Sequence, residues 1–192
     1  GYAIASESCS LDLIGATNIK DVQPGEVIVL WDRKKTTHHL DKKVTKHFCI
    51  FEHIYFSRPD SVIDNQLVYN VRKRIGEELA KETYIDSDMV VPVPDSGSIS
   101  ALGYAKQSKI PFELGLTRSH YVGRTFIEPT QKIRDLGVKL KHSAMRLCKD
   151  KTITVVDDSI VRGTTAKKII KMIRKAGAKK IHMRISSPPV TG

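Results

Sequence analysis

The chain has few of the residues that mark several common classes of protein. Its 192 residues include only three cysteines, Cys9, Cys49 and Cys148, whose wide spacing excludes a disulfide framework and a zinc site built from cysteines alone. No run of 18 or more apolar residues occurs and no signal-peptide pattern opens the chain, so we expect a cytoplasmic protein without a membrane partner. Aromatic residues make up only 6% and none form a string among the lysines, which disfavours nucleic-acid binding. Neither GxxxxGK[ST] nor GxGxxG occurs, which excludes two common nucleotide-binding loops.

The composition indicates a globular protein with a strongly basic last third. Hydrophobic residues make up 40% of the chain, so we expect one good core and room for a second partial unit. Residues 130–184 contain 16 Lys and Arg against 4 acidic residues, while the preceding residues are close to neutral. A basic surface of this kind binds nucleic acid, steers a small anionic substrate, or is a solvated helix face. Because aromatic residues are scarce, we favour the last two.

Residues 152–165, TITVVDDSIVRGTT, combine a strand, an acidic pair and a polar turn. The β-branched run 153–156 predicts a strand buried on both faces of a parallel sheet. Asp157 and Asp158 follow it. Because two adjacent carboxylates are costly to bury together, we expect them to be exposed at the rim, where they bind sugar hydroxyls or a divalent cation. The turn then leads into an amphipathic helix expected at 166–176, so backbone N–H groups, hydroxyls and a helix N-terminus converge on an anion site.

An ordinary strand, turn and helix with Thr165 as N-cap would also fit these residues. The order of strand, acidic pair and Gly-Thr-Thr nevertheless resembles the phosphoribosyl pyrophosphate (PRPP) motif of type I phosphoribosyltransferases. The full string VVDDSIVRGTT resembles the version of that motif in the glutamine PRPP amidotransferase family. The resemblance implies that Asp157 and Asp158 are catalytic residues that hold the ribose and Mg²⁺. It implies substrate-binding roles for five residues of the turn: Ser159, Arg162, Gly163, Thr164 and Thr165.

A second strand and polar turn occur earlier in the chain. A strand is predicted at 90–93, followed by the turn PDSG and a helix to about residue 107, so the turn is a second candidate anion site. By itself PDSG is typical of an ordinary turn. Beside the first motif it resembles the pyrophosphate loop of the same family. The resemblance implies that Asp95, Ser96 and Gly97 bind the diphosphate and that Ser96 also contacts Mg²⁺.

The stretch 118–144 is rich in Lys and Arg and is interrupted by glycine and proline, so it is too irregular for one helix. A loop of this length inside a compact domain is usually functional or disordered. YVGRTF at 121–126 resembles the flexible loop of the family, which closes over PRPP. The resemblance implies catalytic roles for Arg124 and Lys141, whose charges would stabilise the departing diphosphate.

The beginning of the chain resembles a different part of the same family. ASESCSLDLIGA at 5–16 is similar to the end of the glutaminase domain that precedes the transferase domain. We therefore expect residues 1–46 to be the C-terminal remnant of a glutaminase domain plus an exposed linker or edge hairpin, and 47–192 to be a phosphoribosyltransferase domain that is incomplete at its C-terminus. Gly1 is not the N-terminal cysteine nucleophile of the glutaminase, so we expect no glutamine hydrolysis by this chain.

Residues 48–61, FCIFEHIYFSRPDS, are predicted to form a strand entering the core. The YFSRPDS end of this stretch again resembles the amidotransferase family. Cys49 stands where iron–sulfur members of the family place the first of four ligands, which implies a possible 4Fe–4S cluster in the full-length protein. From this chain alone, Cys49 is expected to be a buried free thiol.

Regular elements alternate along the rest of the chain. Apolar residues four apart predict an amphipathic helix over 66–82. They are Leu67, Val71, Ile75 and Leu79. Further strands are expected at 111–117 and 179–187. The alternation predicts an α/β type I phosphoribosyltransferase fold, with a parallel twisted sheet flanked by helices and the ligand at the carboxyl ends of the strands.

The resemblance extends over essentially the whole chain and implies the reaction of the family's transferase domain. Ammonia would displace pyrophosphate from PRPP to give 5-phosphoribosylamine, the first step of de novo purine biosynthesis. It further implies Mg²⁺ as cofactor, the glutaminase domain as partner in the full-length chain, and a homo-oligomer. The main alternative is a regulator of the same fold that senses PRPP or nucleotides, which would ordinarily carry a DNA-binding unit that the sequence does not contain. A second alternative is a phosphoribosyltransferase that acts on a base, which would lack ASESCSLDLIGA.

Overall fold

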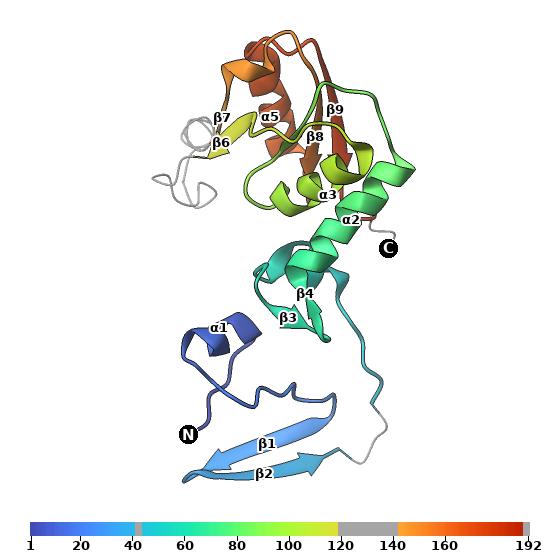
Figure 1. Ribbon diagram of the computed structural model, residues 1–192. Coiled ribbons are helices and arrows are strands. Elements are labelled where there is room, and N and C mark those ends of the chain that lie inside the picture. The colour runs from blue at the N-terminus through green and yellow to red at the C-terminus, as the bar shows by residue number, and fades with distance from the viewer. Residues whose placement is uncertain (41–43, 119–141, 190–192) are drawn as a thin grey trace. The chain divides into compact units, whose positions relative to one another are not determined.

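The computed structural model of the chain describes residues 1–40, 44–118 and 142–189 (Figure 1). The chain forms two compact units, residues 1–69 and 70–192. Residues 47–69, which we expected to belong to the transferase domain, therefore fold with the N-terminal segment, and the family boundary at residue 46 stays a prediction. Within the described ranges, no helix has both the length and the apolar character needed to span a membrane.

The first unit contains only short elements. They are α1 Ser8–Leu13, β1 Glu26–Trp31, β2 Lys34–His39, the π-helical turn Glu52–Phe56, β3 Val62–Ile63 and β4 Gln66–Leu67. β1 and β2 form an antiparallel hairpin in which Trp31 lies opposite Lys34. Every residue of β2 is exposed. Of the two alternatives expected here, an exposed linker or an edge hairpin, residues 34–39 therefore form the exposed second strand of a hairpin.

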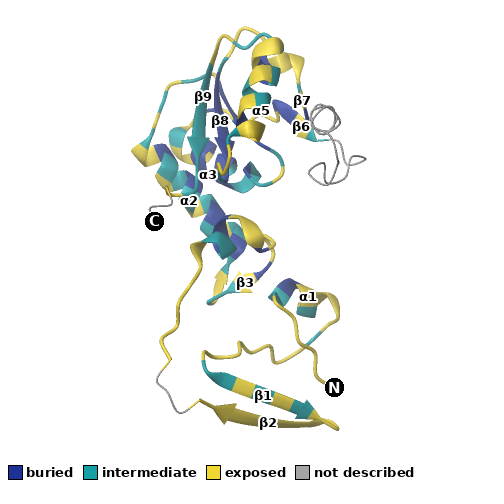
Figure 2. Cartoon of the chain, turned by 180° about the vertical axis from the view of Figure 1, so that it is seen from behind, coloured by how far each residue is buried: buried dark blue, intermediate teal, exposed yellow. Residues whose placement is uncertain are grey.

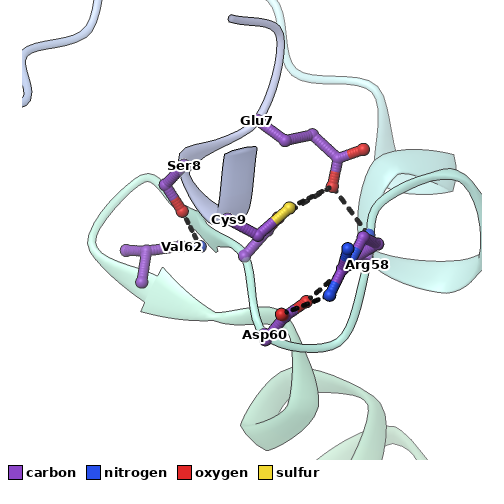
Figure 3. A network of polar contacts seen from close by, with 7 residues as sticks. Glu7, Ser8, Cys9, Arg58, Asp60 and Val62 are labelled. Atoms are coloured by element: carbon purple, nitrogen blue, oxygen red, sulfur yellow. Dashed lines mark hydrogen bonds and ion pairs between the residues drawn. The ribbon is translucent and has the colours of Figure 1, made fainter. Parts of the chain in front are cut away.

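Polar contacts join α1 to the segment before β3 (Figure 3). One carboxylate oxygen of Glu7 accepts hydrogen bonds from the backbone N–H of Arg58 and from the Ser61 hydroxyl, both at 2.7 Å. The hydroxyl oxygen of Ser8 accepts the backbone N–H of Val62 at 2.8 Å. Two stretches about 50 residues apart are therefore neighbours in space. They are ASESCSLDLIGA and YFSRPDS, which resemble the same family.

The strand predicted at 48–61 is wrong, because residues 50–56 are helical. The backbone N–H of Ser57 donates to the carbonyl of Glu52 at 3.2 Å, and the Ser57 hydroxyl donates to the Glu52 carboxylate at 2.7 Å. Aromatic residues favour strands where neighbouring strands bury them. Tyr55 and Phe56 are more than half exposed in this unit, so local hydrogen bonds determine the backbone instead.

The second unit is built on a parallel sheet in the order β5-β8-β9. Its strands are β5 Met89–Pro92, β8 Thr152–Asp157 and β9 Lys180–Ile185, with β6 Leu116–Arg118 and β7 His142–Ala144 forming a separate antiparallel pair. Its helices are α2 Val68–Glu82, whose first turn contains the unit boundary, α3 Ser98–Ser108, the short 3-10 turn Arg146–Cys148 and α5 Thr164–Lys175. The predicted parallel sheet is confirmed. Of the strand predicted at 111–117, only residues 116 and 117 lie in a strand, which is β6. Phe112 makes a single parallel bridge to Val90.

Two core clusters cover the two faces of the sheet, because successive strand residues point in opposite directions. One joins the strands to α5 and consists of Met89, Val91, Val93, Leu116, Cys148, Ile153, Val155, Ile169 and Ile173. The other joins the strands to α2 and α3 and consists of Ala80, Val90, Ala101, Tyr104, Ala105, Ile110 and Val156. Figure 2 shows β8 as buried and β9 as half-buried. The central strand that carries the acidic pair is therefore held between two helical layers.

The buried face of α2 differs from the predicted one by one residue. The predicted apolar stripe is only half-buried, and the buried positions are Val68, Arg72, Gly76 and Ala80. A Cβ atom at Gly76 would lie 1.9 Å from the carbonyl oxygen of Ser100, and one at Gly103 would lie 2.0 Å from the carbonyl oxygen of Lys73. The two helices therefore approach with their backbones in contact, which requires small residues where a hydrophobicity pattern expects large ones.

Substitution of Gly76 with Ala is expected to destabilise the protein by about 2 kcal/mol or more, because a methyl group at the helix crossing would push α2 and α3 apart. The gain in helix propensity, about 1 kcal/mol, would offset only part of that cost. Urea unfolding checks the expectation, with Asn70→Ala on the exposed face of α2 as the matched control. A Gly76→Ala protein as stable as the control would contradict it.

Candidate functional site

The acidic pair lies at the carboxyl end of the central strand. Asp157 is the last residue of β8 and is paired in register with Ile185 of β9. On the other side, Pro92 at the end of β5 pairs with Val156. The polar segments that follow β5, β8 and β9 therefore emerge at the same edge of the sheet, as expected for ligand sites in parallel α/β folds.

Asp157 and Asp158 are buried, with exposed fractions of 7% and 5%. The prediction that they are exposed at the rim is therefore wrong, although their position at the strand end is confirmed. Burial raises the pKa of Asp157 to about 8. The Asp158 carboxyl adds to this rise through a hydrogen bond and through its charge. A proton on Asp157 removes the repulsion that made burial of both carboxylates appear too costly.

The PDSG turn contacts the acidic pair directly. Burial raises the pKa of Asp157, and the nearby Ser96 side chain lowers it by a smaller amount. A Cβ atom at Gly97 would lie 2.4 Å from the carbonyl oxygen of Val156 and 3.0 Å from the Cα of Asp157, so only glycine allows this approach. The two turns, both expected at the carboxyl edge of the sheet, are thus adjacent parts of one site.

The backbone N–H groups of the PDSG turn are not all available to a ligand. That of Gly97 donates to the carbonyl of Val93 at 2.9 Å, and that of Ser98 donates to the carbonyl of Asp95 at 3.2 Å. Within the described residues, the N–H groups of Asp95 and Ser96 donate to no protein acceptor. These two amides are therefore the ones that an anion could occupy, while Gly97 shapes the turn.

The segment after β9 holds the acidic pair from the opposite side, a contact that the sequence analysis missed. The N–H of Ser186 donates to the carbonyl of Asp157 at 3.0 Å, and that of Ser187 donates to the carbonyl of Asp158 at 2.8 Å. The Ser186 hydroxyl also lies 3.4 Å from the Asp158 carbonyl. The strand predicted at 179–187 included both serines, whereas β9 ends at Ile185, so no sequence signal indicated this role.

The turn between β8 and α5 is open to solvent, and most of its residues are exposed. The Ser159 hydroxyl donates to the Asp158 carboxylate at 2.7 Å. Gly163, at φ 68°, is the N-cap residue of α5, and no side chain caps the helix, so the alternative with Thr165 as N-cap is wrong. Across the part of the chain that the structure describes, the N–H groups of Gly163, Thr164 and Thr165 donate to no acceptor. Free amides at a helix N-terminus form an anion site, which Arg162 precedes in the same exposed turn.

The β6–β7 pair also contacts the PDSG turn, which no sequence pattern indicated. Arg118, at the end of β6, forms an ion pair with Asp95. His142, its register partner on β7, places Nε2 3.4 Å from the carbonyl oxygen of Pro94. Both strands of the pair therefore contact the turn.

Three further predicted site residues lie apart from this arrangement. Arg124 and Lys141 fall in the range 119–141, outside the described residues. Cys49 is exposed, so its prediction as a buried free thiol is wrong. Among the described residues, no group of three or more His, Cys, Asp or Glu side chains could hold a metal ion.

The site does fit Mg²⁺ when the ion is shared with a substrate. The Ser96 hydroxyl and the carboxyl groups of Asp157 and Asp158 are hard oxygen donors, the type that Mg²⁺ prefers. Two carboxylates alone are too few for a protein-only site, but Mg²⁺ is commonly held by one or two carboxylates together with substrate phosphates and water. The free amides around the pair mark where such phosphates would lie.

The arrangement agrees with known protein sequences. Residues 60–186 match the family described as "Phosphoribosyl transferase domain". Over 96% of its length the chain is 54% identical to an amidophosphoribosyltransferase of Rhizobium etli, and over 98% it is 46% identical to that of Bacillus subtilis. It is 56% identical over 97% of its length to amidophosphoribosyltransferase 1, chloroplastic, of Arabidopsis thaliana. The chain covers 38%, 40% and 33% of these three relatives, so it spans between a third and two fifths of their length.

Solved structures agree as well. A structure described as the allosteric regulatory enzyme of purine biosynthesis matches with a TM-score of 0.88 and 46% identity, covering 97% of this chain and 40% of that one. The glutamine PRPP amidotransferase from B. subtilis complexed with ADP and GMP matches with a TM-score of 0.87 and 46% identity, covering 97% and 41%. These matches also confirm the predicted type I phosphoribosyltransferase fold. The chain therefore belongs to the phosphoribosyl transferase domain family, in the segment that it shares with the amidophosphoribosyltransferases.

Proposed function

We propose that the chain is the transferase portion of an amidophosphoribosyltransferase. The nitrogen of glutamine-derived ammonia would form a bond to the anomeric carbon of PRPP while the bond from that carbon to the diphosphate breaks. The products are 5-phosphoribosylamine and pyrophosphate, and ammonia loses one proton to water. This is the first step of de novo purine biosynthesis.

One observation carries the proposal: a buried acidic pair lies between two turns that each offer free backbone N–H groups. PRPP has a 5′-phosphate, a ribose with two vicinal hydroxyls, and a diphosphate, in that order. The turn before α5 supplies donors for the first, Asp157 and Asp158 supply acceptors for the second, and the PDSG turn supplies donors for the third. The order of the three chemistries across the site follows the order of the groups in the substrate.

Each group of residues would have a distinct task. The 5′-phosphate would bind to Thr164 and Thr165 and to their neighbours Ser159, Arg162 and Gly163. The acidic pair would hold the ribose hydroxyls and stabilise positive charge that develops at the anomeric carbon. Mg²⁺ would neutralise the diphosphate as it leaves. Arg124 and Lys141 would stabilise the same leaving group and exclude water.

The test is product analysis of the full 192-residue chain with PRPP, Mg²⁺ and an ammonium salt. Pyrophosphate release that requires ammonium supports the proposal. Release at the same rate without ammonium would indicate hydrolysis, and release only with a purine or pyrimidine base would indicate a base-dependent transferase. PRPP binding without any turnover would favour a PRPP sensor.

We expect PRPP to bind only with Mg²⁺, because the negative charge of the acidic pair and that of the diphosphate repel each other across a shared site. Calorimetric titration with PRPP, in excess Mg²⁺ and then in EDTA, measures the difference. Affinity should fall by at least about tenfold in EDTA. Equal affinity under the two conditions would count against a shared metal site.

The proposal extends to the setting of the reaction. A glutaminase domain in the full-length protein would deliver the ammonia, residues 1–46 being its C-terminal remnant, and the protein would work as a homo-oligomer in the cytoplasm. A 4Fe–4S cluster at Cys49 would belong to the full-length protein only. One plant relative carries a chloroplastic name, so chromatographic sizing and cell fractionation of the full-length protein are the relevant measurements.

A further inference from the structure

An ion pair joins the PDSG turn to the β6–β7 pair. A guanidinium nitrogen of Arg118 donates to the carboxylate of Asp95. Opposite Arg118 in the β6–β7 register, His142 lies against the carbonyl of Pro94. Two residues that face each other across two strands thus contact two consecutive residues of the turn.

The charge of Asp95 is unfavourable for the proposed task of this turn. The available amides belong to Asp95 and Ser96, so an anion bound there lies beside the Asp95 carboxylate. Like charges at such short range disfavour binding. Among the described residues, Arg118 is the one cation paired with Asp95.

Stability alone does not account for this pair. The side chains of Arg118 and Asp95 are 34% and 63% exposed, and ion pairs with this exposure contribute little to folding. The backbone of the turn is held independently by the bonds from Gly97 and Ser98. The ion pair therefore changes the charge of the turn more than its shape.

We propose that Arg118 is a positioning residue of the diphosphate site: it cancels the charge of Asp95, so that a diphosphate can bind beside this carboxylate, and it does not bind the diphosphate itself. The inference rests on the proposed function for the identity of the anion. It assigns to Arg118 a role that acts through Asp95 and depends on the presence of that carboxylate.

The test is calorimetric titration of the full chain with PRPP and, separately, with inorganic pyrophosphate, both in excess Mg²⁺. Arg118→Gln is expected to raise both dissociation constants by about tenfold or more, since it leaves a bare carboxylate at the site. Arg118→Lys, which keeps the charge, should stay within about threefold of the wild type. The double variant Arg118→Gln/Asp95→Asn should also return to within about threefold. Arg174→Gln, an exposed charge removal on α5, controls for the general loss of positive charge.

Each outcome decides the inference. If Arg118→Gln binds the probes as tightly as the wild type does, Arg118 has no role at the site. If the double variant binds as weakly as Arg118→Gln, Arg118 contacts the anion directly. Either result overturns the proposal. Thermal unfolding shows whether Arg118→Gln folds. If it does not fold, the single variant Asp95→Asn decides the question. The proposal requires that Asp95→Asn binds the probes as tightly as the wild type or more tightly, and weaker binding overturns it. A wild-type chain that binds neither probe defeats the proposed function, whereas wild-type binding that Arg118→Gln leaves unchanged defeats this inference only.

Discussion

Replacing Asp157 and Asp158 together with Asn is expected to lower ammonia-dependent turnover by about a hundredfold or more. Asn keeps the size and most of the hydrogen bonding of Asp but removes the negative charge that, under the proposed function, would stabilise an electron-poor anomeric carbon. Loss of a preorganised electrostatic partner of the transition state has effects of this scale. Pyrophosphate release at saturating ammonium measures it, and calorimetric PRPP affinity gives a second readout if basal turnover is low.

The matched control is Asp150→Asn. Asp150 is exposed in the turn before β8, at the opposite end of the strand, and has φ 59°, which Asn tolerates. It should leave turnover within about twofold. The double variant should be as stable as the wild type or more stable, because neutral Asn side chains avoid the desolvation cost of buried carboxylates in the empty folded state. Turnover within about threefold of wild type would end the case for the acidic pair, and collapse of the fold would indicate a structural role.

The second large effect is expected in the pH dependence of stability without Mg²⁺. The pKa of Asp157 is about 8 in the folded chain and about 3.9 when unfolded. Between these values the folded state binds the extra proton, so stability falls as pH rises. The contribution of Asp157 is complete below about pH 4 and is lost as pH rises to about 8, with a slope that approaches about 1.4 kcal/mol per pH unit.

Asp157→Asn isolates this contribution. At pH 5 the folded wild type still holds its proton, so urea unfolding should give a smaller difference between variant and wild type than at pH 8. At pH 8 the variant should be the more stable by at least about 2 kcal/mol. A difference between the two proteins that does not change from pH 5 to pH 8 would mean that Asp157 is ionised throughout. Excess Mg²⁺ and PRPP should reduce the difference, because they stabilise the ionised pair.

Local patterns were enough to predict the sheet and the position of the site. Runs of β-branched residues such as 153–156 identify buried strands, and an acidic pair directly after such a run marks a strand end. Parallel strands place their carboxyl ends together, so DDSIVRGTT and PDSG could be assigned to one edge before any coordinates were known. The hydrophobic period of residues 66–82 likewise predicted a helix, although not its buried face.

Tertiary structure decided everything that depends on which segments touch. The buried face of α2 contains Gly76, which packs against α3, instead of the predicted apolar stripe. Backbone contact between the two helices at Gly76 and Gly103 requires small residues, which a hydrophobicity pattern ignores. The aromatic residues near Tyr55 form a helical turn because no neighbouring strand buries them.

At the site, Asp157 and Asp158 can be buried because the N–H groups of Ser186 and Ser187, distant in sequence, donate to their backbone carbonyls and because one carboxyl can hold its proton. The pairing of Arg118 with Asp95 is of the same kind, since 22 residues separate the partners and only packing of the β6–β7 pair against the PDSG turn brings them together. The sequence by itself therefore determined which chemical groups the protein carries and at which strand ends they lie. Their burial, charge state and partners followed from packing, because desolvation and hydrogen bonding depend on neighbours that no local pattern specifies.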